Sequence, residues 1–290
     1  MMHEIDLKAV GRLIDLAVDE DYADGDPTSE ITVAEDAWGR AGIVSREKIV
    51  VCGMSIVGDI LGRYSRKLGL QVLVNDGEEA GEGDLLGVIQ GPTRSLLAAE
   101  RVVLNFLQRL CGISTGTKEY VDAVKGTKAK ILDTRKTTPG WRELEKYAVR
   151  CGGGVNHRMN LGDGVLIKDN HVTEFGDKIA EKLGPMVARA RLYPRVKFVG
   201  VEVDDVDFQL KQVLAVEGID VVLLDNMSYK EMRRAVEMRN EMCGERPLLE
   251  ASGNIRLENV REVAETGVER ISVGALTHSA VSVDIGLDRE

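Results

Sequence analysis

The sequence lacks several features by which whole classes of protein are recognised. Its four cysteines are scattered, with no CxxC pair and no zinc-ligand spacing, which argues against a disulfide framework and a zinc module. No apolar run reaches the length of a membrane span, and residues 1–6 show neither the basic nor the apolar region of a signal peptide. We therefore expect a cytoplasmic protein with reduced thiols.

An excess of positive charge is also missing. The 290 residues include 38 Lys and Arg against 48 Asp and Glu, a formal net charge of −10, which argues against nucleic-acid partners and anionic membranes. The charge is uneven, however. Residues 101–170 contain 13 basic and 7 acidic residues, so this segment carries +6 and leaves −16 for the remainder. The segment is either a solvated basic face or a binding region for a small anion, which local charge can attract.

The first hundred residues predict an α+β region. Apolar residues recur at helical spacing in residues 5–18, and a loop of turn residues follows at 20–28. Further patterns predict a small sheet with helices. The predicted strands are 39–52, 70–74 and 84–89, and the predicted helices are 54–68 and 95–110.

The remaining chain alternates short apolar strands with helices of about 10–15 residues. Within the predicted strand 220–224, residues 221–224 form the continuous Val/Leu run that is typical of a buried parallel strand. Such units build either a barrel or an open doubly wound sheet, and the lack of a GxGxxG or P-loop pattern favours a barrel of eight strands or fewer. The predicted strands are 129–132, 164–167, 198–203, 220–224, 248–250 and 270–273, and the helices are 142–150, 178–192, 206–216, 229–242 and 257–266.

Polar groups follow every one of these strands, at the end where α/β barrels carry their active sites. Three of the four histidines, His157, His171 and His278, fall in this set. A single polar residue at a strand end is commonly a cap or turn former, and that interpretation stands for Asp133 and Asn226. The complete set is better explained by a site.

The set includes a cationic group and a pair of carboxylates. Converging cations repel one another and need an anionic ligand of multiple charge, for which arginine offers bidentate hydrogen bonds. Glu202 and Asp225, on adjacent strands, could bind Mg²⁺, act as acid and base, or stabilise positive charge; the alternative is ion pairing with the cations. The cations are Arg135, Lys136, His157, Arg158 and Lys168.

Glycine-containing turns close the last two strands, at Ser252-Gly253-Asn254 and Val273-Gly274-Ala275. Glycines let backbone N–H groups approach a phosphate, as in the phosphate site after the final strands of many barrels. Together the groups predict a transfer between a phosphorylated sugar and an acidic acceptor.

The motifs resemble the quinolinate phosphoribosyltransferase family, also called nicotinate-nucleotide pyrophosphorylase (carboxylating), over nearly the whole chain. Within residues 20–28, Pro27 stands where many members carry an aliphatic residue. The matching motifs are 100–101, 134–140, 152–154, 156–158, 163–171, 202–203, 224–226, 250–254 and 274–278.

The resemblance implies an open (β/α) barrel of about six parallel strands plus an N-terminal α+β sandwich-like domain. The N-terminal domain would comprise residues 1–108, joined by the C-terminal segment 276–290, and the barrel residues 109–275. The resemblance also implies a homodimer with a shared active site, in which Arg101 completes the partner's site, or a hexamer of such subunits.

The implied reaction joins quinolinate to phosphoribosyl pyrophosphate and gives nicotinate mononucleotide, pyrophosphate and CO₂, with Mg²⁺ as cofactor and no nucleic-acid or membrane partner. Glu202 and Asp225 would be catalytic and hold the metal, and Lys136 would be catalytic and bind the leaving pyrophosphate. Quinolinate would be bound by Arg101, Thr134, Arg135, His157, Arg158 and Lys168. Phosphoribosyl pyrophosphate would be bound by Lys136, Asp169, Asn170, His171, Ser252, Gly253, Asn254, Val273, Gly274 and Ala275.

Other functions stay open at this point. A related phosphoribosyltransferase could use nicotinate, although its single carboxylate fits the many cations less well. Another pyridine acid, or the substrate of a paralogue associated with molybdenum transport, is a further alternative. Lys168 could be the Schiff-base lysine of an aldolase, and a non-catalytic binding module would leave the carboxylate pair unexplained.

Overall fold

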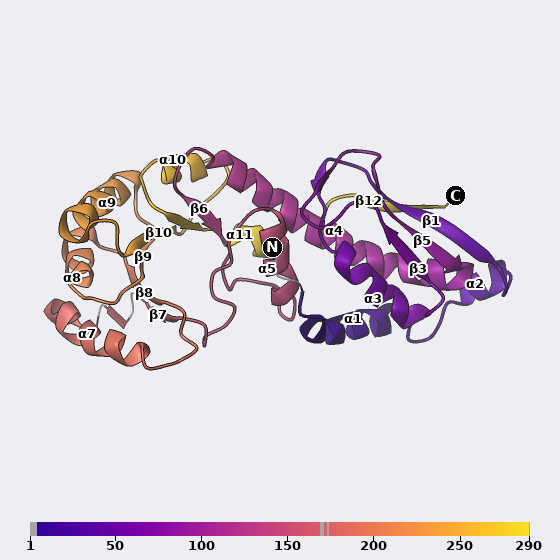
Figure 1. The fold of residues 1–290 in the computed structure, drawn as a ribbon, viewed down its shortest axis with the longest axis horizontal. Helices are drawn as coiled ribbons and strands as arrows, with labels where there is room; N and C mark the ends of the chain where they lie inside the picture. Colours follow the sequence, from indigo (N-terminus) through magenta and orange to yellow (C-terminus); the bar gives the residue numbers. More distant parts are fainter. Residues whose placement is uncertain (1–4, 169–170, 173, 290) are drawn as a thin grey trace. The chain divides into compact units, whose positions relative to one another are not determined.

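The computed structural model describes residues 5–168, 171–172 and 174–289. Its contacts group into two compact units (Figure 1). Unit 1 comprises residues 1–118, 136–154 and 276–290, and unit 2 comprises 119–135 and 155–275. These units do not follow the predicted limits 1–108 and 109–275, because α4 (Thr93–Ala123) is one helix that continues past residue 108 and because residues 136–154 pack with unit 1.

Unit 1 contains the helices α1 (Leu7–Tyr22), α2 (Pro27–Thr32), α3 (Met54–Tyr64), α5 (Arg142–Cys151) and most of α4. The predicted loop at 20–28 is shorter than expected, since a helix begins inside it. Asp26 accepts a hydrogen bond from the Ser29 N–H (3.0 Å) as the N-cap, and Pro27 occupies the first helical position. The Asp-Pro pair therefore starts α2.

Two antiparallel sheets complete unit 1. The larger has the order β12 (Ile285–Arg289), β1 (Trp38–Ser45), β5 (Leu85–Pro92), β3 (Gly69–Val72), and the smaller pairs β2 (Ile49–Val50) with β4 (Glu79–Ala80). The predicted strand 39–52 is thus two strands. Gly87 lets the larger sheet approach α3, because a Cβ there would lie 2.8 Å from Met54 Cε.

Unit 2 is built on six parallel strands in the order β6, β11, β10, β9, β8, β7, with helices on the outside (Figure 1). This confirms the predicted fold class. Residues 206–214 form a π-helical turn (Val206–Leu210) followed by α8, in place of one predicted helix. The strands are β6 (Lys130–Leu132), β7 (Val165–Ile167), β8 (Val199–Val203), β9 (Val221–Asp225), β10 (Leu248–Ser252) and β11 (Arg270–Ser272), and the helices are α7 (Ile179–Ala190), α8 (Lys211–Leu214), α9 (Tyr229–Cys243) and α10 (Val260–Ala264).

The two faces of this sheet differ in chemistry. Neighbouring strands place Glu202 opposite Leu223, and Leu223 opposite Glu250, so both carboxylates share a face. The residues directly before and after these positions point to the opposite face, which carries the buried apolar side chains Val201, Val222, Ala251 and Ile271. We call the first the inner face and the second the outer face.

Contacts of β11 identify the outer face as the one covered by helices. Glu269, one residue before Arg270, forms an ion pair of 2.8 Å with Arg239 of α9, whereas Arg270 lies opposite Glu250. The charged inner face is therefore the place to look for a site. None of the described helices is long and apolar enough to cross a membrane.

Candidate active site

The chain after β6 is held in place by a buried carboxylate. Asp133 is fully buried and accepts hydrogen bonds from the His157 backbone N–H (2.8 Å) and the Asn156 side chain (2.5 Å). Val155 also pairs with Leu132 in a parallel bridge. Asp133 is therefore more than a strand cap, since it fixes residues 155–157 beside the end of β6.

This arrangement gathers two of the predicted cations. Arg158 donates from Nη1 to the Gly164 carbonyl (2.8 Å), and its side chain is half-buried. Burial lowers the pKa of Arg158, and the positive charge of nearby Arg135 lowers that pKa further. Thr134 and Arg135 are also only partly exposed. Two guanidinium groups within electrostatic range favour an anion between them.

The His157 side chain is largely buried. Its side chain is 8% exposed, and its ring packs edge-on against Phe198 at 5.3 Å between centroids. Nδ1 accepts a hydrogen bond from the Arg158 N–H (2.8 Å), and Nε2 lies 3.4 Å from Oε1 of Glu250. Both ring nitrogens therefore contact protein atoms.

Glu250 is a charged residue of the site that sequence reasoning missed. It is fully buried, and its Oε2 accepts from Arg270 Nε at 2.7 Å. The available signal was a carboxylate inside an apolar strand, where a charge requires a partner. That partner comes from a neighbouring strand and could not be read from local sequence.

Lys168 and Glu202 lie near each other on adjacent strands, with 3.9 Å between Nζ and Oε1. The lysine side chain is 54% exposed and that of Glu202 is 11% exposed, so this ion pair is loose and partly hydrated. His171 is exposed, and its Nδ1 accepts from the Lys168 N–H (3.1 Å). The predicted ligands Asp169 and Asn170 lie outside the described residues.

The turns after β9 and β10 are locked to each other. Asn226 has a φ of 53°, bonds to the Asp225 carboxylate (2.9 Å) and accepts from Asn254 Nδ2 (3.1 Å). Gly253 has a φ of 92°, and a Cβ there would lie 2.1 Å from Asn226 Oδ1. Only glycine fits this position, so the turn Ser252-Gly253-Asn254 is held beside Asp225.

The turn after β11 lies next to that after β10, because the two strands are parallel neighbours. The Val273 N–H is already donated to the Leu132 carbonyl (2.8 Å). Any backbone donor for a phosphate at this turn must therefore come from the residues after Val273. Gly274 and Ala275 are both partly exposed there.

The inner face offers a metal two carboxylates. Glu202 lies opposite Leu223, and Asp225 follows Leu223 by two residues, so both side chains are on the inner face near the strand ends. Among the described residues there is no group of three acidic, His or Cys side chains suited to a metal. Mg²⁺ binds through one or two carboxylates together with substrate phosphates and water, so this donor set fits it.

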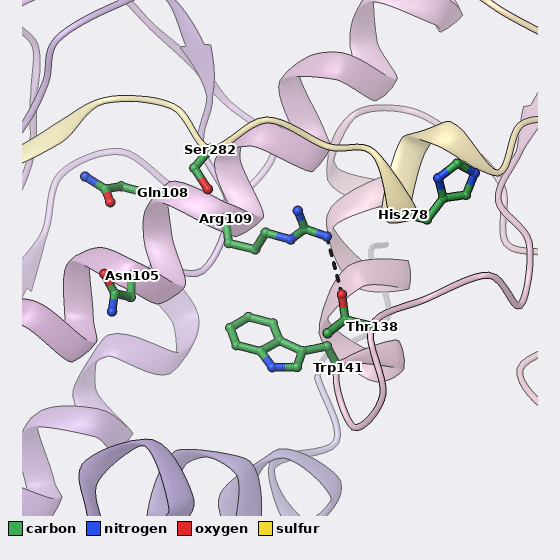
Figure 2. Close-up of a pocket in the computed structure, with 7 residues that line it drawn as sticks. All are labelled: Asn105, Gln108, Arg109, Thr138, Trp141, His278 and Ser282. Carbon is green, nitrogen blue, oxygen red and sulfur yellow. Dashed lines mark hydrogen bonds between the residues drawn. The ribbon is translucent and has the colours of Figure 1, made fainter. Parts of the chain in front are cut away.

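Three predicted residues belong to unit 1 and are described within it. Arg101 lies exposed on α4, and Lys136 is exposed, with its carbonyl accepting from Thr277 Oγ1 (2.7 Å). His278 lines a groove of about 580 Å³ together with Trp141 (Figure 2). The Trp141 ring stacks on Phe106. The other residues that line this groove are Asn105, Gln108, Arg109, Thr138 and Ser282.

Arg109 does not make this groove an anion site. Its guanidinium bonds to the buried Glu145 carboxylate (2.8 Å) and to the carbonyls of Thr277 (2.7 Å) and Ala280 (2.8 Å). Its charge is thereby neutralised within unit 1.

Fold and site together define an α/β-barrel enzyme with cations and paired carboxylates at its strand ends. The family model for the quinolinate phosphoribosyl transferase N-terminal domain matches residues 26–111, and that for the C-terminal domain matches residues 113–288. The chain belongs to the quinolinate phosphoribosyltransferase family.

Relatives support this assignment over the full length. The chain is 43% identical to nicotinate-nucleotide pyrophosphorylase [carboxylating] of Mycobacterium leprae, covering 99% of this chain and all of the relative. It is 37% identical to the probable enzyme of that name from Bacillus subtilis, covering 93% of this chain and 89% of the relative. The structure of the Francisella tularensis nicotinate-nucleotide pyrophosphorylase superposes with a TM-score of 0.89 at 35% identity, covering 100% of this chain and 99% of that chain.

Proposed function

We propose that this enzyme transfers the phosphoribosyl group of phosphoribosyl pyrophosphate to quinolinate and removes one carboxylate, a step of de novo NAD biosynthesis. The products are nicotinate mononucleotide, pyrophosphate and CO₂. The observation that carries this proposal is an inner face that bears the carboxylates Glu202 and Asp225, with the cation Lys168 3.9 Å from Glu202. The cations suit an anionic acceptor, and the carboxylates suit a cationic transition state.

Quinolinate is a dianion, and the cations at the ends of β6 and β7 would bind its carboxylates. Arg158 is already oriented by the Gly164 carbonyl, so its remaining N–H groups are directed by the fold and little entropy is lost on binding. Lys168 adds a point charge on the neighbouring side. Nicotinate has one carboxylate and would leave part of this positive charge uncompensated.

The transfer itself forms a bond from the quinolinate ring nitrogen to the anomeric carbon while the bond to pyrophosphate breaks. Positive charge develops on the ribose in a transition state like that of glycoside cleavage. Glu202 and Asp225 face the same side of the sheet and would stabilise that charge. Because Glu202 is largely buried, its effect is stronger than it would be in water.

The phosphate groups would occupy the turns at the ends of the last strands. The 5′-phosphate fits the turn at residues 252–254, where Gly253 brings backbone close without a side chain. Lys136 would neutralise the leaving pyrophosphate, with His171 as a second contact. Asp169 and Asn170 stay predictions for the same substrate.

Mg²⁺ would be held by Glu202 and Asp225, with substrate oxygens and water as its other ligands. Bound there, the ion would neutralise charge on the pyrophosphate and help to position the ribose. The two carboxylates would then serve both as metal ligands and as stabilisers of the ribose cation.

Loss of CO₂ needs no further group from the protein. Ribosylation makes the ring nitrogen cationic, so the electron pair left when the adjacent carbon–carboxylate bond breaks is stabilised by that charge. A proton then replaces CO₂ on the ring carbon. The enzyme has only to hold the second carboxylate and admit the proton.

We also propose a homodimer in the cytoplasm. Arg101 lies exposed on α4, where an isolated arginine would be merely hydrated, and it would complete the quinolinate pocket of the partner subunit. Mixing inactive Arg101→Ala and Glu202→Ala subunits should then restore activity, because one combined site is intact. Mixtures that stay inactive despite forming mixed dimers would contradict the shared site.

One assay tests the proposed reaction. The enzyme is incubated with phosphoribosyl pyrophosphate, Mg²⁺ and either quinolinate or nicotinate, and the mononucleotide and CO₂ are both measured. Product from quinolinate with matching CO₂ supports the proposal, and product from nicotinate alone would overturn it.

A further inference from the structure

The buried carboxylate of Glu250 is not used by the proposed reaction. It lies on the inner face of β10, opposite Arg270 of β11 and next to Leu223 of β9. Removing a carboxylate from water costs several kcal/mol unless charges and hydrogen bonds compensate. A charge at this position therefore requires compensating partners.

Two cationic or polar groups compensate for that cost. Arg270 Nε donates to Oε2 at 2.7 Å, and His157 Nε2 lies 3.4 Å from Oε1. Burial by itself raises the pKa of Glu250, but His157 and then Arg270 outweigh it, so the pKa lies below its ordinary value. Glu250 is therefore an anion at neutral pH.

The His157 ring lies between Glu250 and the main chain of Arg158 and contacts both. Its Nδ1 accepts the Arg158 N–H at 2.8 Å, which leaves the ring proton to Nε2; the 3.4 Å approach of Nε2 to Glu250 Oε1 is an electrostatic contact and not an aligned hydrogen bond. This neutral tautomer makes both contacts at once. A protonated ring would have no acceptor for the Arg158 amide.

A second carboxylate holds the same segment from the other side. Asp133 of the β6 end binds the His157 N–H and the Asn156 side chain. Residues 156–158 are thus clamped between carboxylates from β6 and β10. We call these contacts of residues 156–158 with Asp133 and Glu250 the clamp. The Arg158 guanidinium is oriented by a hydrogen bond to the Gly164 carbonyl.

We infer that Glu250 is a positioning residue for the quinolinate pocket, acting through the His157 ring on the main chain of Arg158. The inference rests on the proposed function, because it takes Arg158 as a ligand of the quinolinate carboxylate. It also gives His157 a role inside the protein, in addition to the direct contact with quinolinate that the family resemblance implies.

The first test compares Glu250→Gln with Glu269→Gln. Removing the negative charge that faces the His157 ring should raise the Kd and KM for quinolinate about tenfold, with kcat and the KM for phosphoribosyl pyrophosphate unchanged. Glu269→Gln removes a carboxylate that also binds a buried arginine, but on the outer face. It should leave quinolinate binding unchanged even where it lowers the melting temperature.

The second test uses the wild-type enzyme, so it does not depend on how Glu250→Gln folds. Nitrogen-15 NMR should show the His157 ring neutral, with the proton on Nε2, both before and after quinolinate is added. A protonated ring, or a quinolinate-dependent change of its tautomer, would overturn the inference. So would a Glu250→Gln variant with unchanged quinolinate affinity, or an equal loss in Glu269→Gln.

The two tests separate this inference from the proposed function. If the wild type neither binds nor converts quinolinate, the proposed function fails, while the NMR spectrum still reports the contact of His157 with Glu250. If the wild type converts quinolinate and Glu250→Gln behaves identically, only the inference fails.

Discussion

Two glutamates in unit 2 have similar chemistry and different surroundings. Glu250 on the inner face binds Arg270, and Glu269 on the outer face binds the fully buried Arg239 of α9. Arg270 and Glu269 are consecutive residues, so the alternation of side chains sends them to opposite faces. The outer pair joins α9 to the sheet. In the inner pair, Glu250 also contacts the His157 ring, which in turn accepts a hydrogen bond from the Arg158 N–H. Buried charge alone therefore does not identify a functional group; the face and the next contact do.

The largest effect is expected where the inner face meets the reacting atoms. Glu202→Ala should lower kcat/KM on quinolinate by on the order of 10²–10³, because charge stabilisation of the transition state is lost. Lys136→Ala should do the same through the leaving group. Steady-state kinetics check both, with the exposed Glu217→Ala as a control that should keep full activity. Near-normal kcat/KM in either variant would contradict the catalytic role of that residue.

The second largest effect, a loss of stability, is expected when the ion pair between Arg239 and Glu269 is broken. Arg239→Met should reduce the free energy of unfolding by about 3–5 kcal/mol, because it leaves Glu269 without its buried partner. Denaturant unfolding measures this loss, and the folded variant should retain the quinolinate KM of the wild type. A variant that is stable but binds quinolinate poorly would show that the outer face also serves the site.

A smaller effect, on quinolinate affinity, is expected from a conservative change of Arg158. Arg158→Lys keeps the charge but loses the planar fork, so the Kd for quinolinate should rise about tenfold, as for a lost charged hydrogen bond of ~1.5–3 kcal/mol. Calorimetric titration gives the Kd. Arg189→Lys, at an exposed position of α7, is the matched control and should change nothing.

The smallest effect is a dependence of stability on pH. Burial raises the pKa of Glu269, but Arg239, the Leu249 N–H and Lys128 together lower it below its ordinary value of 4.5. A lowered folded-state pKa contributes stability above pH 4.5 that is lost as the pH falls through the folded value. The unfolding free energies of wild type and Glu269→Gln should therefore differ by a constant amount at neutral pH and converge in acid. A difference that grows in acid would contradict a lowered pKa of Glu269 in the folded protein.

Much of unit 2 could be predicted because its signals are local. The run at 221–224 is apolar on both faces of a parallel strand, and Asp225 follows it directly, so strand and site residue are read together. Glu202 was found in the same way. The roles of these residues stay predictions, since position alone does not show what each binds.

Non-local contacts explain what could not be predicted. The full length of α4 was missed because residues 112–117 contain Gly112, Ser114 and Gly116, which are typical of helix ends. In the structure Ser114 donates to the Val50 carbonyl (2.7 Å), and a Cβ on Gly112 would meet the Val281 carbonyl at 2.0 Å. Packing against distant segments therefore sets these residues. Glu250 was missed for the same reason, since its partners come from β11 and residue 157.

The most direct test of the central claim is a competition at equal concentrations of quinolinate and nicotinate. Phosphoribosyl pyrophosphate and Mg²⁺ are supplied in excess, and quinolinate carries an isotopic label in the carboxylate next to the ring nitrogen. The account predicts that mononucleotide and labelled CO₂ form in a ratio of one to one while nicotinate is left unconsumed. Mononucleotide formed from nicotinate, without release of labelled CO₂, would contradict it.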